Sequence, residues 1–128
     1  MQLGELEKQV LHYLWNTPEA DTKQVHAALG STSGRSLNTV QSTLERLFKK
    51  GLLSRAKQGH AYFYNAKLDR AALISKLITN VTNDFIEDGE HSLLAAFSSA
   101  SANLNDDQLD KLERLIEEQR QLRKRGQA

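Results

Sequence analysis

The stretch SLNTVQSTLERLFKKGLL, residues 36–53, decides the fold of this chain. Its apolar residues recur at the spacing of one helix face, and Ser36 precedes them as a residue that can cap a helix. That face consists of Val40, Leu44, Leu47 and Phe48. Gly51 then allows the backbone conformation that commonly ends a helix. The stretch therefore predicts one capped amphipathic helix with polar side chains on its outer face.

A hairpin is expected directly after this helix. Residues 52–57 and 60–65 form two short segments separated by Gln58 and Gly59. The second segment contains Tyr62, Phe63 and Tyr64, which favour strands, and a glycine between two such segments favours a tight turn. Because an isolated two-stranded hairpin is marginal in water, these strands must pack on the helices.

Two helical patterns precede the central helix. Apolar residues at helical spacing from Leu3 to Trp15 predict a first helix over roughly residues 3–16, which ends before Pro18. Asp21 can cap a short second helix, and Gly30 is expected to end it in the left-handed conformation. Three helices followed by a hairpin are the elements of a winged helix.

The second half of the chain predicts three more helices, over roughly residues 68–88, 90–101 and from Asn105 onward, where Asn105 and Gln108 have the spacing of a capping box. About 60 residues in three helices cannot bury so many large side chains alone, so self-association is expected. Packing back onto the N-terminal core is the alternative. The residues expected to form a dimer interface are Leu77, Val81, Phe85, Leu94, Phe97, Leu109, Leu112 and Ile116.

The predicted fold is thus mainly α with a small β-hairpin. Residues 1–66 are expected to form a winged helix-turn-helix domain and residues 67–128 a helical dimerisation domain.

Charge is divided unevenly along the sequence. Residues 35–60 contain six basic residues and one acidic residue, a net charge of +5. Residues 84–118 contain ten acidic and two basic residues, a net charge of −8. The first region therefore suits an anionic partner such as DNA, whereas the second does not.

The polar face of the central helix and the basic hairpin carry the residue types that read and hold DNA. Amide side chains pair with adenine, Arg pairs with guanine, and hydroxyl or cationic groups bind phosphates. A solvated helix face and a merely soluble hairpin tip remain the alternative interpretation. The candidate DNA-binding residues are Ser36, Asn38, Thr39, Gln41, Ser42, Arg46, Lys49, Arg55, Lys57, His60 and Tyr62.

Other classes of function find little support. The chain has no cysteine, which excludes thiolate metal sites and thiol nucleophiles, and it has no apolar run of membrane-spanning length or secretory signal. A cytoplasmic protein without cofactor is expected. Asp88, Glu90 and His91 lack a second histidine at ligand spacing, so no metal site is predicted. No catalytic motif is present, and an enzyme is not expected.

Residues 36–53, the segment RAKQGHAYFY at 55–64 and the opening LGELEKQVLHYLW at 3–15 resemble the penicillinase-repressor family of winged-helix regulators. The resemblance implies a homodimer that binds a palindromic operator and blocks transcription. It also implies that Thr39, Val40 and Arg46 match positions of the recognition helix, and that Gly59, Ala61 and Tyr62 match positions of the wing.

Two departures from the family limit what the resemblance implies. Antibiotic-sensing members are cut at an Asn-Phe bond by a sensor-linked protease, whereas the matching place here is Ala96-Phe97. Copper-sensing relatives have a cysteine-rich tail, which this chain lacks. The inducing signal and a sensor protease as partner therefore stay open, as does a winged helix that binds protein instead of DNA.

Overall fold

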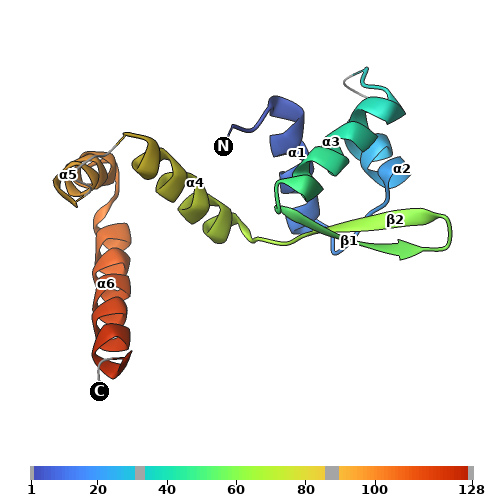
Figure 1. Ribbon diagram of the computed structural model, residues 1–128. Helices are drawn as coiled ribbons and strands as arrows, with labels where there is room; N and C mark the ends of the chain where they lie inside the picture. The colour runs from blue at the N-terminus through green and yellow to red at the C-terminus, as the bar shows by residue number, and fades with distance from the viewer. Residues whose placement is uncertain (1, 31–33, 86–89, 127–128) are drawn as a thin grey trace. The chain divides into compact units, whose positions relative to one another are not determined.

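The computed structural model describes residues 2–30, 34–85 and 90–126, with the side chains of residues 90–92 left out (Figure 1). The chain divides into two compact units, Met1–Val81 and Thr82–Ala128. The predicted domain boundary after residue 66 remains a prediction.

The first unit begins with two helices whose starts are capped. Helix α1 spans Glu5–Asn16, and the Glu7 side chain accepts a hydrogen bond of 3.0 Å from the Gly4 N–H. Helix α2 spans Thr22–Val25, where Asp21 accepts from the Gln24 N–H at 2.9 Å, as the sequence predicted. Both starts thereby satisfy backbone donors that have no partner inside the helix.

The expected end of the second helix is wrong in one respect. Gly30 is not left-handed, because the helix continues into a π-helical turn, His26–Gly30, that contains this glycine. A Cβ at Gly30 would collide with the ring of His26, whose Nε2 lies 2.9 Å from the Arg35 carbonyl oxygen. Glycine is therefore required here for space and not for backbone conformation.

Helix α3 spans Leu37–Lys49, and its two ends follow the sequence prediction. Ser36 accepts a hydrogen bond from the Thr39 N–H at 3.1 Å. At the other end Gly51 has φ 80°, the Gly51 N–H donates to Phe48 O, and the Leu52 N–H donates to Leu47 O, both at 3.0 Å. These two bonds form a Schellman motif, which turns the chain directly from α3 into the first strand.

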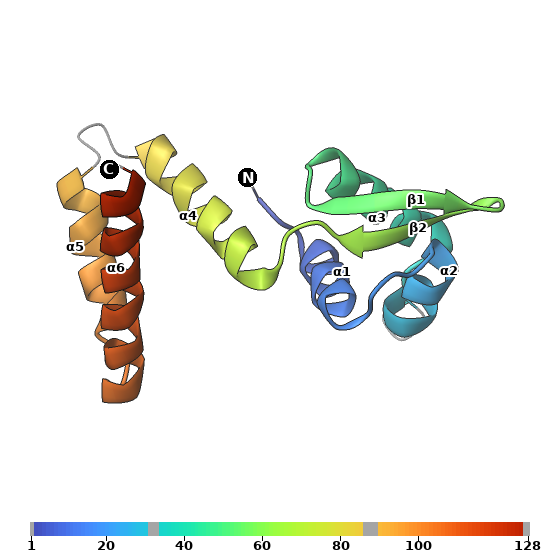
Figure 2. The same cartoon turned by 90° about the horizontal axis from the view of Figure 1, so that it is seen from below.

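The hairpin consists of strands β1, Leu53–Gln58, and β2, Ala61–Ala66, paired antiparallel (Figure 2). Its loop is Gly59 and His60, one residue later than expected, because the positive φ of 64° at Gly59 suits the first central position of a tight hairpin turn. The turn projects beyond the helices of this unit in both views. At the hairpin base, Ala20 and Tyr64 exchange backbone hydrogen bonds of 2.8 and 3.0 Å.

One core holds these elements together. Its buried apolar residues are Leu6, Val10, Leu11, Leu14, Ala20, Val25, Val40, Leu44, Leu47, Leu52, Leu53, Tyr64 and Leu73. Trp15 packs against this core while half-buried, and its Nε1 donates to the Leu68 carbonyl at 2.9 Å. This bond ties α1 to the segment that leaves the hairpin.

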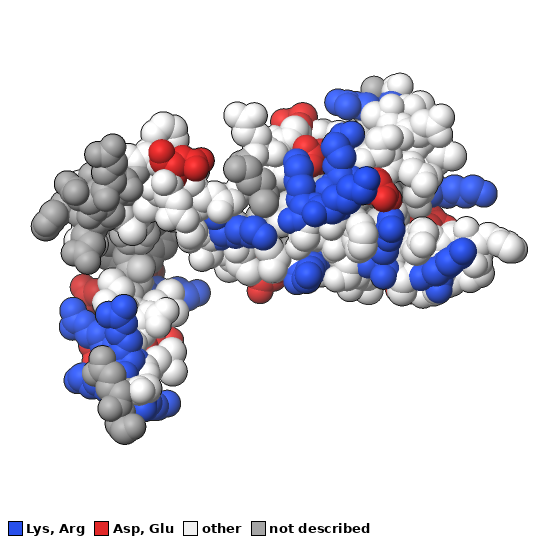
Figure 3. Space-filling model, in the orientation of Figure 1, with Lys and Arg blue, Asp and Glu red and all other residues white. Residues whose placement is uncertain are grey.

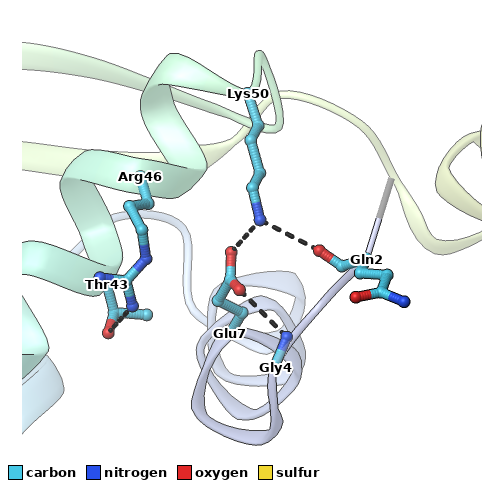
Figure 4. Close-up of polar contacts among 6 residues, drawn as sticks. All are labelled: Gln2, Gly4, Glu7, Thr43, Arg46 and Lys50. Carbon is cyan, nitrogen blue, oxygen red and sulfur yellow. Dashed lines mark hydrogen bonds and ion pairs between the residues drawn. The ribbon is translucent and has the colours of Figure 1, made fainter.

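An ion pair joins the start of α1 to the end of α3 (Figure 4). Lys50 Nζ lies 2.7 Å from Glu7 Oε2 and also donates to the Gln2 carbonyl at 3.1 Å. Burial by itself raises the pKa of Glu7, but the hydrogen bonds from Lys50 and Gly4 and the charges of Lys50 and Arg46 outweigh it, so the pKa lies below its usual value of 4.5. The carboxylate is thus held in its charged form.

Three further helices follow. Helix α4 spans Arg70–Phe85, α5 spans Glu90–Ser101 and α6 spans Asp106–Gly126. Asn105 and Gln108 form the predicted capping box, with hydrogen bonds of 2.9 and 3.0 Å. The expected end of the fourth helix near residue 88 lies outside the described residues. The predicted architecture, mainly α with one small hairpin, is confirmed.

Replacing Glu7 by Gln should lower the free energy of unfolding by roughly 1–2 kcal/mol at pH 7, because a charge-assisted hydrogen bond to a partly solvated lysine is lost. Since folding lowers the pKa of Glu7, its stabilisation is present above pH 4.5 and is lost as the pH falls through the lower folded value. Urea unfolding of both proteins should therefore give curves that converge in acid.

Glu5→Gln is the matched control, because Glu5 is an exposed carboxylate in the same first turn. It should change stability less than Glu7→Gln does. A constant difference between wild type and Glu7→Gln across the acid range would contradict the role given to the ion pair.

Candidate DNA-binding surface

Helix α3 presents one continuous polar face to solvent. Val40, Thr43, Leu44 and Leu47 are fully buried, which leaves the opposite side of the helix exposed. Each candidate residue on or beside this helix is exposed: Ser36, Asn38, Thr39, Gln41, Ser42, Arg46 and Lys49. Val40, which the family resemblance placed at a matching position, packs in the core and is inaccessible to a partner.

The candidates at the start of α3 already have partners within the chain. The Ser36 and Thr39 hydroxyl oxygens lie 2.9 Å apart, and Ser36 also accepts from the Thr39 N–H. Asn38, Gln41 and Ser42 occupy positions three and four residues apart, which places them side by side on the exposed face. Amide and hydroxyl groups are therefore grouped near the N-terminus of the helix.

Arg46 lies at the edge of this face, toward α1 (Figure 4). Its Nη2 donates to Thr43 Oγ1 at 3.1 Å, and Thr43 Oγ1 donates to the Thr39 carbonyl at 2.8 Å. One bond orients the guanidinium, and the remaining donors of the five that an arginine has can face a partner.

The hairpin of β1 and β2 and helix α3 line one groove. This groove has a volume of about 250 Å³, and its lining includes Thr22 and Lys23 of α2, Gln41 of α3, and His60 and Tyr62 of the hairpin. The structure therefore brings together three segments of the sequence: the start of α2, the exposed face of α3 and the tip of the hairpin.

Two cationic candidates on β1 differ in their surroundings. Lys57 is exposed. Arg55 is half-buried, and its guanidinium lies 4.0 Å from the centre of the Phe48 ring and 4.2 Å from that of Tyr62. Arg55 Nη1 also forms an ion pair of 2.6 Å with Glu45 Oε2. Lys57 is thus presented to solvent, whereas Arg55 is engaged inside the protein.

The ionisation of Arg55 follows from these contacts. The hydrogen bond of 3.4 Å to the Tyr64 hydroxyl and the ion pair with Glu45 raise the pKa of Arg55 above its ordinary value. The guanidinium therefore neutralises Glu45, the acidic residue that lies within the basic region 35–60.

Positive charge gathers on this part of the first unit. Figure 3 shows Lys and Arg side chains grouped where Figure 1 labels α3, with others along the hairpin. Sequence reasoning missed Lys23, which is exposed and lines the groove. The signal for it was available, because the first helix of a helix-turn-helix crosses the DNA backbone and a lysine in its first turn suits that place.

The candidate dimer residues fall into two groups. Leu77 and Leu112 are half-buried, and Leu77 packs against the core of the first unit. The others are exposed: Val81, Phe85, Leu94, Phe97, Leu109 and Ile116. Leu115 and Leu122 are exposed as well, at 49% and 59%, and were missed because they lie off the expected series. None of the described side chains of α5 and α6 is buried.

The described residues show neither a membrane span nor a metal site. No helix among them has the length and hydropathy needed to cross a bilayer. They contain no group of three His, Asp or Glu side chains arranged to hold a metal. Asp88 and the side chains of Glu90 and His91 lie outside what the structure describes. Ala96 and Phe97 are exposed within helix α5.

Comparison with known proteins gives one consistent family. The profile described as Penicillinase repressor matches residues 3–118. The penicillinase repressor of Bacillus licheniformis is 27% identical over 134 residues, covering 96% of this chain and 95% of that protein. The transcriptional regulator BlaI of Mycobacterium tuberculosis is 30% identical over 118 residues, covering 91% of this chain and 84% of that protein.

A solved structure agrees with these relatives. The solution structure of the DNA-binding domain of the repressor BlaI is similar with a TM-score of 0.51 and 32% identity, over 56% of this chain and 87% of that one. The family resemblance found in the sequence is thereby confirmed. With a family profile that spans most of its length and relatives matched nearly end to end, the chain belongs to the penicillinase repressor family.

Proposed function

We propose that this protein is a cytoplasmic transcriptional repressor that binds a palindromic DNA operator as a homodimer. The observation that carries the proposal is the juxtaposition of the exposed polar face of α3 with the hairpin across one groove. The matched relatives are named as repressors and regulators, which supports the same function.

Helix α3 is the element that enters the major groove in this proposal. The helix has one side anchored in the core, and its exposed side offers amide and hydroxyl groups near the N-terminus and the Arg46 guanidinium in the last turn. Recognition helices contact base edges with residues at this end, and the partial positive charge there favours the approach of phosphates. Asn38, Gln41 and Arg46 are the residues proposed to read bases.

The hairpin and α2 supply the contacts with phosphate. Lys57 and His60 project from the hairpin, and Lys23 lies in the first turn of α2. Such contacts position the protein without carrying sequence information. Cations on both sides of α3 can therefore hold the helix in register with the groove.

A second copy of the chain is proposed to cover the exposed apolar side chains of α4–α6. Phe85, Leu94 and Ile116 are 82%, 67% and 45% exposed in a single chain. Large apolar side chains exposed in such number mark a surface that binds another protein. Two-fold symmetry then sets two α3 helices into successive major grooves, about 10 base pairs or a multiple apart. A sensor protease as a further partner stays a prediction.

DNA binding should weaken steeply with salt. If each protomer neutralises about three to five phosphates, a plot of log affinity against log salt for the dimer should have a slope on the order of −5 to −9. Fluorescence anisotropy with the promoter upstream of the protein's own gene measures this slope. A slope near zero, or no binding to any duplex, would favour a winged helix that binds protein instead.

Arg46→Ala and Lys57→Ala should weaken DNA binding in different ways. Loss of the Arg46 guanidinium should cost about 1–3 kcal/mol on the operator and reduce preference among bases at one position. Loss of Lys57 should weaken all duplexes alike and make the salt slope shallower. Titration of both variants against operator and scrambled duplexes separates the two effects, and identical profiles would remove the assignments.

Leu109→Lys together with Ile116→Lys should dissociate the dimer, because two charges would be placed on an apolar seam of α6. Operator affinity should fall when the dimer dissociates, since the two protomers that bind the half-sites would no longer be linked. Sedimentation velocity measures the change in mass. Gln121→Lys adds one such charge on another face of α6 and should leave the dimer intact; an intact dimer in the double variant would exclude the proposed seam.

A further inference from the structure

We infer that Arg55 is a positioning residue that fixes the hairpin against α3, and that it acts on DNA through the placement of Lys57 and His60. This inference rests on the proposed function. It assigns to Arg55 a role different from the phosphate contact that its charge alone suggests.

The contacts of Arg55 bridge two elements. Its guanidinium lies over the ring of Phe48, at the end of α3, and over that of Tyr62, on β2, with ring centres 4.0 and 4.2 Å away. The ion pair of 2.6 Å with Glu45 adds a second bond to α3, one turn before Phe48. A planar guanidinium can stack on two rings and pair with a carboxylate at once, which an ammonium group cannot.

Arg55 lies at the outer limit of the partly buried half of β1, and we call it the anchor because it holds this strand to α3. Burial falls along β1 from Leu53, which is in the core, through Arg55, which is half-buried, to Lys57, which is exposed. On the hairpin side, the groove of about 250 Å³ is lined by His60, Ala61, Tyr62 and Tyr64. The strand therefore leaves the protein body where Arg55 is held.

The position of the Lys57 side chain is coupled to that of Arg55 by the geometry of the strand. Residues 55 and 57 lie on the same side of β1, about 7 Å apart along the strand. The register pairs Lys57 with Tyr62, whose ring Arg55 stacks upon. A change in the angle at which the hairpin leaves α3 would move the Lys57 ammonium away from the place where α3 meets DNA.

The test uses Arg55→Lys and Glu45→Ala in the full-length protein, with a duplex selected by the wild type from a random pool. Arg55→Lys keeps the charge but loses the stack, and it should weaken binding roughly three- to thirtyfold. Glu45→Ala removes an anion from the face that meets DNA, so electrostatics alone would strengthen binding; loss of the anchor should weaken it instead. The sign of the Glu45→Ala effect therefore separates positioning from direct contact.

A double-mutant cycle and hydrogen exchange complete the test. Lys57→Ala should cost less affinity in the Arg55→Lys background than in the wild type, because the hairpin is already displaced. Amides of residues 56–63 in the free protein should exchange faster in both anchor variants, while those of α1 stay unchanged. Circular dichroism confirms that the variants are folded.

Arg70→Lys is the matched control, since Arg70 also lies over an aromatic ring, that of Trp15 at 5.1 Å, but belongs to α4 and not to the hairpin. It should leave hairpin exchange and affinity unchanged. Tighter binding by Glu45→Ala, additive effects of the Arg55 and Lys57 variants, or unchanged hairpin exchange would each overturn the inference. If the wild type selects no duplex, the proposed function fails, and hairpin exchange alone then decides whether Arg55 is the anchor.

Discussion

Burial of one face of α3 is the constraint on which the rest of the first unit depends. Val40, Thr43, Leu44 and Leu47 are closed off from solvent, and α1, α2 and β1 all pack against this helix. Because the angular spacing of helical residues is constant, burial of these positions determines which side chains point outward. Packing of the core thus determines which residues of α3 are accessible to a partner, although the core residues themselves are not accessible.

Features set by near neighbours in the chain were predictable from the sequence. The caps at Ser36 and Asn105 and the helix end at Gly51 each depend on residues within a few positions, and the structure contains all three. The behaviour of Gly30 was not predictable in this way. Its role comes from the ring of His26 folding over it, and a propensity for the left-handed conformation gives no information about that contact.

The candidate site also contains some features that the sequence predicts and others that only tertiary packing determines. Periodicity and charge correctly indicated which residues of α3 would be exposed, but charge alone could not show that Arg55 turns inward to Phe48, Tyr62 and Glu45. Those partners come from a helix and from the opposite strand, and only tertiary packing brings them together. Likewise, the apolar pattern of α4 could not show that Leu77 packs on the first core while Val81 stays exposed.

The Schellman turn at Gly51 leaves only a short connection between α3, which ends at Lys49, and β1, which begins at Leu53. Two hydrogen bonds close that connection, so the base of the hairpin has little freedom to reorient relative to the helix. A surface that is already ordered before association loses little conformational entropy when it docks. The association rate would then depend on diffusion and electrostatic steering, without a slow rearrangement inside the domain.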